Sequence, residues 1–125
     1  MRYTTSHEWC RVNDGVAECG ISKHAAEQLN DLTFVDLTAQ PGDELEQGAP
    51  FGEVESVKTT SDVYAPVSGT VEAVNERFQD EGNLPGLTDD PEGADSWLIK
   101  IKVADPSQLE GLLDAAGYAE HCASE

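Results

Sequence analysis

The sequence FGEVESVK at residues 51–58, continued by TTSDVYAPV at residues 59–67, is the centre around which the rest of the chain can be interpreted. Two runs of strand-forming residues flank a short polar stretch that has Lys58 in its middle. Such a pattern is typical of a β-hairpin, so the segment predicts a hairpin with Lys58 at its tip. A lysine at a tip is ordinarily a solvated side chain, and its role therefore depends on the remainder of the chain.

The pattern of the first hairpin strand recurs later in the chain. GEVESV at residues 52–57 and GTVEAV at residues 69–74 both have the form G-x-V-E-x-V. Two related strands in one small chain favour a pseudo-symmetric β structure, although so short a match can also arise by chance. No longer repeat is present, so a solenoid is not indicated.

Further strands are expected on both sides of the hairpin. Their segments are 6–12, 16–21, 32–37, 69–74 and 97–103. The pair Asp14-Gly15 predicts a tight turn between the first two, because such pairs accept the positive φ values of a two-residue loop. Alternation in the last segment predicts one apolar face and one largely polar face that includes Leu98.

Two helices are expected, one near each end of the chain. Ser22 is a suitable N-cap for a helix over residues 23–29. Asp105-Pro106 is a typical helix start, Gly117 is the expected stop, and a polar tail follows. Six or seven short strands with two small helices predict a mainly β fold, a compact barrel or sandwich in a single domain, residues 1–125.

Composition narrows the classes of partner. The chain has 25 Asp and Glu against 7 Lys and Arg, a formal net charge of -18. Such a chain should repel nucleic acid and anionic membranes and favour partners with basic docking surfaces, although the charge can also serve solubility alone. No run is long enough to span a bilayer and no targeting segment opens the chain, so we expect a soluble, cytoplasmic protein.

Catalytic and metal-binding patterns are weak in this sequence. The three cysteines form no C-x-x-C pair, and none of His7, His24 and His121 has the spacing typical of a zinc finger, so no metal site is predicted. Phosphate-binding glycine motifs are absent. The chain is therefore not expected to be an enzyme. A lysine amine can instead carry a cofactor through an amide, and the cofactor then supplies the chemistry.

Several blocks of sequence carry a specific resemblance to a known family. They are SHEW at 6–9, GVA at 15–17, FVDL at 34–37, FGEVESVK at 51–58, SDVYAPVSG at 61–69 and WLIKIK at 97–102. Together they resemble the H proteins of the glycine cleavage system, over about residues 3–120. The resemblance implies the barrel-sandwich hybrid fold that lipoyl and biotinyl domains share.

The resemblance also implies a function. Lys58 would carry lipoic acid in amide linkage, attached by a lipoyl or octanoyl transferase or a lipoate ligase. The arm would take an aminomethyl group from glycine at glycine decarboxylase, deliver it to the tetrahydrofolate-dependent aminomethyltransferase, and be reoxidised by dihydrolipoamide dehydrogenase. A monomer is expected, cytoplasmic or, in a eukaryote, in the mitochondrial matrix.

Three residues match the family's cleft for the loaded arm: Ser6, Glu8 and Asp62. A carboxylate suits a protonated aminomethyl nitrogen because charge-assisted hydrogen bonds are strong. Two positions depart from the family. The segment 87–93 lacks the aromatic that many members have there, and Gln28 occupies the position where some members have a histidine late in the first helix.

Alternatives remain open on the sequence alone. An H-like lipoyl carrier could serve a lipoyl relay or another redox pathway. Biotinyl domains flank their lysine with methionines, and the lipoyl domains of 2-oxoacid dehydrogenases favour Asp-Lys-Ala, so Val57-Lys58-Thr59 matches neither. A cysteine-dependent or metal-dependent enzyme would require the fold to gather residues that are distant in sequence.

Overall fold

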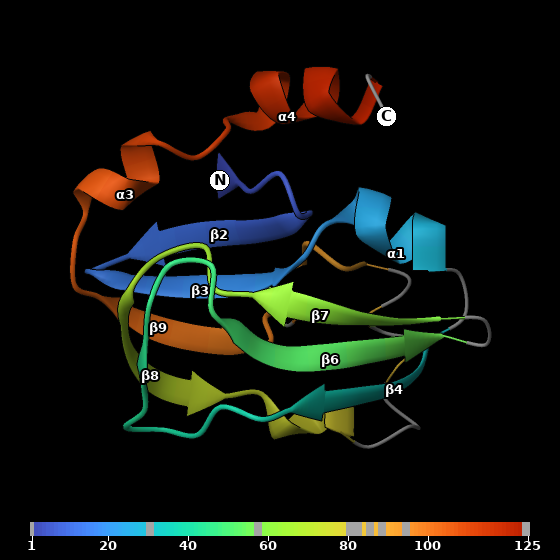
Figure 1. Ribbon diagram of the computed structural model, residues 1–125, viewed down its shortest axis with the longest axis horizontal. Coiled ribbons are helices and arrows are strands. Elements are labelled where there is room, and N and C mark those ends of the chain that lie inside the picture. The colour runs from blue at the N-terminus through green and yellow to red at the C-terminus, as the bar shows by residue number, and fades with distance from the viewer. Residues whose placement is uncertain are drawn as a thin grey trace.

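The computed structural model describes residues 2–29, 32–56, 59–79, 84, 87, 90–93 and 96–123. It has two antiparallel sheets with short helices at their edges, as Figure 1 shows. The mainly β fold with two packed layers and short helices, expected from the sequence, is confirmed. Among the described residues, no helix combines the length and the hydropathy that crossing a bilayer would require.

The larger sheet has six strands in the order β1-β2-β3-β9-β8-β5. The tight turn between β2 and β3 has positive φ at Asp14 (54°) and Gly15 (78°), which confirms the predicted two-residue loop. The strands are β1 (Arg2–Tyr3), β2 (Glu8–Asn13), β3 (Val16–Ile21), β5 (Glu44–Leu45), β8 (Gly69–Val74) and β9 (Ile99–Val103).

The smaller sheet has three strands in the order β4-β6-β7. They are β4 (Leu32–Leu37), β6 (Pro50–Ser56) and β7 (Thr60–Tyr64). The buried faces of the two sheets meet in one apolar core, because strands with one buried face must cover it with another layer. Its largest fully buried members are Phe51, Phe78, Leu87, Leu98, Ile99 and Ile101, with Val35, Val54, Val63, Val67 and Val71.

The first helix, α1 (Lys23–Leu29), has the predicted bounds. Its N-cap is Ser22, whose Oγ accepts a hydrogen bond of 3.1 Å from the backbone N–H of Ala25. A short 3-10 helix, η1 (Glu76–Gln79), follows β8. Local capping signals therefore determine this part of the fold.

The C-terminal prediction was wrong in two respects. The expected single helix is two helices, α3 (Ser107–Glu110) and α4 (Ala115–Ala123), and Gly117 lies inside α4 rather than ending a helix. The expected polar tail is the second half of α4, and Figure 1 shows this helix beside the N-terminal segment. The reason is tertiary: Leu113 forms a two-way backbone bridge with Tyr3, and the ring of Tyr118 stacks on that of Tyr3 at 4.3 Å.

Two strand boundaries also differ from the prediction. The strand expected from residue 6 begins at Glu8, because His7 has a φ of 72° and cannot continue an extended strand. The strand expected from residue 97 begins at Ile99. Leu98, predicted on the polar face, is instead fully buried in the core, because it precedes β9 and the alternation of that strand does not extend to it.

Candidate functional site

The hairpin predicted around Lys58 is present on both sides of it. Strands β6 and β7 pair in antiparallel register, with Glu55 opposite Thr60. The N–H of Ser56 donates to the carbonyl of Thr59 at 2.8 Å, so the two strand ends are held together where the chain reverses. Lys58 itself lies outside the described residues, as does its neighbour Val57. Its placement in the turn therefore follows from chain order alone.

A cavity of about 110 Å³ lies beside this hairpin. It is lined by all three of the predicted cleft residues: Ser6 from the turn before β2, Glu8 from β2 in the large sheet and Asp62 from β7 in the small sheet. Its other lining residues are His7, Ile21, Ala25, Gln28, Val54, Ser61 and Val63. The fold thus brings together side chains that lie more than fifty positions apart in the sequence.

Glu8 is the most unusual residue of this cavity, because only 2% of its surface is exposed. Its Oε1 accepts hydrogen bonds from Ser6 Oγ at 2.6 Å and from Thr4 Oγ1 at 2.7 Å. Burial raises the pKa of this carboxyl above its ordinary value, while the two hydroxyls and the backbone N–H of Tyr64 oppose that shift. The arrangement can hold a cationic or hydrogen-bonding group that enters the cavity.

A tight turn before β2 positions the Glu8 carboxylate. The N–H of Thr4 donates to the Glu8 carbonyl at 2.9 Å, and the N–H of His7 donates to the Thr4 carbonyl at 3.2 Å. The left-handed backbone at His7 reverses the chain within four residues. Ser6 is consequently folded back onto the carboxylate two positions later.

A second cavity, of about 270 Å³, lies where Glu8 meets the C-terminal segment. Sequence reasoning missed it, because part of its wall is the α3–α4 connection, which was expected to be helical. Its lining includes Ser6 and Glu8 together with Tyr3, Tyr64, Pro66, Leu112 and Leu113. Glu8 therefore lines both cavities.

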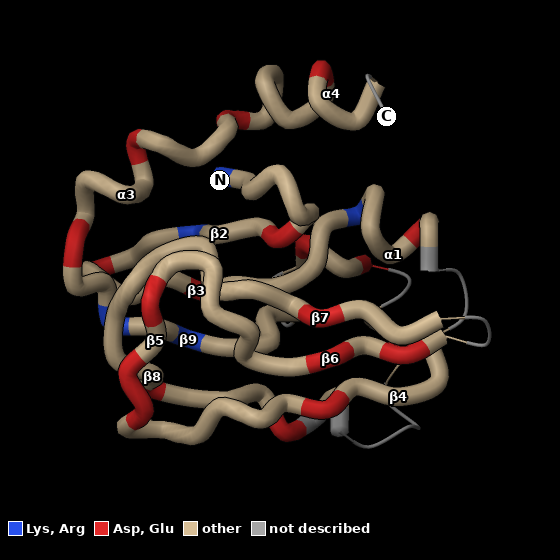
Figure 2. Tube along the Cα trace, in the orientation of Figure 1, with Lys and Arg blue, Asp and Glu red and all other residues tan. Residues whose placement is uncertain are grey.

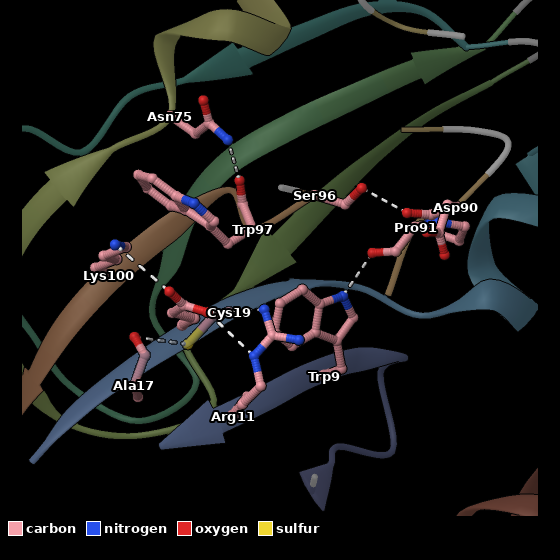
Figure 3. Close-up of polar contacts among 11 residues, drawn as sticks. Trp9, Arg11, Ala17, Cys19, Asn75, Asp90, Pro91, Ser96, Trp97 and Lys100 are labelled. Carbon is pink, nitrogen blue, oxygen red and sulfur yellow. Dashed lines mark hydrogen bonds and ion pairs between the residues drawn. The ribbon is translucent and has the colours of Figure 1, made fainter. Parts of the chain in front are cut away.

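The segment that lacks the family's aromatic is held in place by other contacts. Trp9 Nε1 donates to the Pro91 carbonyl at 2.8 Å, as Figure 3 shows. Glu92 accepts from the Tyr3 hydroxyl at 2.5 Å and from the backbone N–H of Lys23 at 2.9 Å. Gln28, at the other departure, lines the smaller cavity.

Charge is distributed unevenly between the two sheets, as Figure 2 shows. The described strands of the small sheet contain no Lys or Arg. Asp36 lies opposite Glu53, and Glu53 lies opposite Asp62, so three carboxylates form one row across the sheet. Like charges placed opposite one another destabilise a sheet, so this row suits a basic partner surface.

Two of the cations on the large sheet, Arg11 and Lys100, are engaged in local contacts. Arg11 Nη2 lies 2.7 Å from Glu18 Oε1, and Lys100 Nζ lies 3.4 Å from Glu18 Oε2. Each cation also lies over a tryptophan ring, Arg11 over Trp9 and Lys100 over Trp97. These two cations therefore neutralise Glu18 rather than the carboxylate row of the small sheet.

Comparison with known proteins gives consistent results. Residues 1–125 match the family model described as glycine cleavage H-protein. The chain is 45% identical over 124 residues to the glycine cleavage system H protein of Thermotoga maritima, covering 99% of this chain and 97% of that protein. It is 42% identical over 125 residues to the mitochondrial H protein of Oryza sativa, covering all of this chain and 74% of that one.

A solved structure agrees with these sequence matches. The crystal structure of a glycine cleavage system H protein from Mycobacterium marinum superposes with a TM-score of 0.82 at 36% identity. The match covers 94% of this chain and 92% of that one.

Proposed function

The chain belongs to the glycine cleavage H-protein family, which consists of lipoyl carriers rather than catalysts, and on that premise we propose that Lys58 carries lipoic acid in amide linkage. A lipoate ligase or a lipoyl or octanoyl transferase would form the amide. Acylation removes the lysine charge and converts its stem into a flexible arm, and the cofactor then supplies the chemistry. This chain contributes the attachment point, the reach of the arm and its resting place.

The loaded arm transfers the aminomethyl group of glycine between enzymes. In this proposal it receives the group at glycine decarboxylase and delivers it to the tetrahydrofolate-dependent aminomethyltransferase. Dihydrolipoamide dehydrogenase then reoxidises the dithiol. The carrier acts as a monomer, and the row formed by Asp36, Glu53 and Asp62 supports docking to basic surfaces on these partners.

The observation that carries the proposal is the cavity lined by Ser6, Glu8 and Asp62 at the side of the hairpin. Asp62 follows Lys58 by four residues in the sequence, so at most about 14 Å of extended chain separates the two positions. An acylated lysine that folds back along the hairpin would bring its end to this cavity. There the Glu8 carboxylate would accept a hydrogen bond from the protonated aminomethyl nitrogen, while Ser6 and Thr4 keep that carboxylate oriented.

Intact mass tests the attachment. After incubation with lipoate ligase, lipoate and ATP, the full chain should gain one lipoyl group, and Lys58→Arg should gain none. An increment that persists in Lys58→Arg would overturn the assignment of Lys58.

Two matched substitutions test the cavity. Lipoylated Glu8→Gln should lose the aminomethyl group to water faster than the wild type, because the amide provides no negative charge. Glu53→Gln is the control, since Glu53 lies in the carboxylate row but does not line the cavity. Equal release rates in all three proteins would contradict the role of Glu8.

Glycine–bicarbonate exchange with glycine decarboxylase tests the pathway. Lipoylated wild type should support exchange. At low salt, lipoylated Glu53→Gln should need a higher carrier concentration for half-maximal exchange, because it removes one carboxylate from the row that docks to the partner. Failure of fully lipoylated protein would instead favour an H-like carrier used in a lipoyl relay or another redox pathway.

A further inference from the structure

Three metal-binding side chains meet where the N-terminal turn, α1 and α4 come together. His7 precedes β2, His24 lies in the first turn of α1, and Cys122 lies in the last turn of α4. One ligand atom from each lies within 4.8 Å of the others. We propose that His7, His24 and Cys122 bind a single transition-metal ion of the Zn²⁺ class.

The donor set selects the class of ion. Two imidazole nitrogens and one thiolate are borderline to soft ligands, which suit Zn²⁺ and related transition metals. Mg²⁺ and Ca²⁺ prefer oxygen ligands and would not select this group. In a tetrahedral zinc site, bonds of about 2.0–2.3 Å place the ligand atoms roughly 3.3–3.8 Å apart. Because the ligand atoms lie within 4.8 Å of one another, the side chains need to close by at most about 1–1.5 Å, which rotation about their χ angles can supply.

A hydrogen-bonded scaffold already orients one of the three ligands. His7 Nδ1 lies 2.7 Å from the hydroxyl of Tyr118, and that hydroxyl lies 2.5 Å from Ser22 Oγ. If Nδ1–H donates to Tyr118 and Tyr118 donates to Ser22, the lone pair of His7 is on Nε2. Ligating histidines commonly have their second nitrogen held in this way, which sets tautomer and ring direction. Tyr118 and Ser22 are both buried, so the scaffold is rigid.

The site is open to ions from solution. His7, His24 and Cys122 are all partly exposed, and a water molecule can complete the tetrahedron. The His121 ring lies nearby, with its centroid 5.6 Å from that of His7, but the group of ligand atoms within 4.8 Å of one another does not include His121, whose Nε2 donates to the Thr5 carbonyl at 3.1 Å. The formal net charge of -18 favours the approach of a divalent cation.

Metal binding would connect three parts of the fold that are distant in sequence. The ion would fasten α4 to α1 and to the turn before β2. His7 also lines the cavity that contains Ser6 and Glu8, so the ion would hold one wall of that cavity. The proposal does not depend on lipoylation and can be tested on the unmodified chain.

Cobalt titration tests the ligand set directly. Chelator-treated full chain should bind one equivalent of Co²⁺, with a thiolate-to-cobalt charge-transfer band in the near ultraviolet and visible bands of tetrahedral intensity. Zn²⁺ should displace the Co²⁺ and abolish these bands. Cys122→Ser should lose the charge-transfer band, and His24→Ala should weaken binding by at least roughly tenfold.

Two further variants separate ligation from general packing. Tyr118→Phe should keep the thiolate band but weaken binding by about tenfold, because the hydroxyl that holds His7 Nδ1 and contacts Ser22 and Cys122 is lost while all three ligands remain. His121→Gln should leave stoichiometry and spectrum unchanged. If His121→Gln abolished the band while His24→Ala did not, the assigned ligand set would be wrong.

Alkylation provides a readout that needs no variant. Cys10 and Cys19 are buried, so iodoacetamide should modify Cys122 first, at a rate followed by peptide mass. One equivalent of Zn²⁺ should protect Cys122, and chelator should restore its reactivity. Unchanged alkylation with Zn²⁺, or only weak binding of several ions as expected from surface carboxylates, would overturn the proposal.

Discussion

The same sequence pattern, G-x-V-E-x-V, begins within both β6 and β8, yet these strands lie in different sheets and lead into different segments. Their central valines, Val54 and Val71, are both buried in the common core. The glycine that begins each pattern lies very close to the backbone of a neighbouring strand. A Cβ at Gly52 would lie 2.7 Å from the Asp36 carbonyl oxygen, and one at Gly69 would lie 2.0 Å from that of Lys102. The shared pattern therefore reflects shared packing.

The two strands continue into different surroundings. After β8, Asn75 is fixed to the segment before β9: its N–H donates to the Leu98 carbonyl at 2.9 Å and its Nδ2 to the Trp97 carbonyl at 2.7 Å (Figure 3). After β6, the chain continues through residues 57 and 58 into β7, and Ser56 pairs with Thr59. The same pattern thus packs alike in two strands, but the chain that follows it differs: β6 continues into a hairpin with β7, whereas β8 is followed by an asparagine fixed to the segment before β9.

The largest expected effect comes from exchanging those following residues. Lys58→Arg should abolish lipoylation completely, because a guanidinium is not a substrate for amide formation. Asn75→Lys places a lysine after the second pattern but outside a hairpin tip, and it should gain no lipoyl group. Mass spectrometry of both proteins after ligase treatment checks this. Modification at position 75 would show that the pattern alone is recognised.

The next largest effect concerns the two glycines. Gly69→Ala should lower the free energy of unfolding by about 3 kcal/mol or more, and Gly52→Ala by about 1–2 kcal/mol, because added atoms in a packed interior force backbone shifts. The ranking follows from the closer approach at Gly69. Urea unfolding followed by tryptophan fluorescence measures both values. If the two variants lost equal stability, the closer approach of the neighbouring strand at Gly69 would not determine the cost of an added methyl group.

The two buried valines should behave alike. Val54→Ala and Val71→Ala should each destabilise the protein by about 2 kcal/mol, since each removes two methyl groups from the core and leaves a cavity. Urea midpoints with unchanged slopes would report this. A difference of more than about 1 kcal/mol between the variants would show that the two strands are not equivalent in packing.

The polar side chains that follow β8 and end β6 should differ modestly in their contribution to the free energy of unfolding. Asn75→Ala removes the side-chain hydrogen bond to Trp97 and should reduce stability by about 1–2 kcal/mol. Ser56→Ala removes exposed hydrogen bonds to Thr59 and should lower the free energy of unfolding by about 0.5 kcal/mol or less. The same unfolding experiment measures both. If Ser56→Ala were the more damaging, the hairpin side would be the more tightly fixed one.

The smallest expected effect is the pH dependence at Glu8, which borders the β6–β7 hairpin but not β8. Its folded pKa is raised above the ordinary 4.5, so its contribution to stability is present below pH 4.5 and is lost as pH rises through the folded pKa. Glu8→Gln has no carboxyl to ionise and therefore does not lose stability in this way. Between pH 4.5 and the folded pKa of Glu8, the stability of the variant relative to wild type should increase, and above that pKa the difference should become constant. Thermal unfolding at several pH values would show this. A difference independent of pH would contradict the burial argument.

Local signals explain where prediction from the sequence succeeded. The Ser22 cap gave the bounds of α1, and Asp14-Gly15 gave the first turn, because both act over a few residues. The same local reasoning failed at Gly117, where glycine was expected to end a helix. Tertiary contacts prevail there: the bridge between Leu113 and Tyr3 and the stacking of Tyr118 hold α4 against the first strand.

The candidate site divides in the same way. The resemblance pointed to Ser6, Glu8 and Asp62, and the structure places all three in one cavity. The larger cavity and the cluster of His7, His24 and Cys122 were missed, because both depend on the packing of the C-terminal segment, which was expected to be one helix and a polar tail. Motif spacing along the sequence cannot identify residues that only the packing of distant segments brings together.

The sequence alone determined the longer strands, the first helix and the pairing of the two strands that flank Lys58, because propensity, capping and turn chemistry act between near neighbours. Only the tertiary structure decided that Glu8 is a buried carboxylate with its pKa raised, that it borders two cavities, and that metal-binding side chains gather beside it. Burial and desolvation arise where distant segments meet, so they belong to the packed molecule rather than to any stretch of its chain.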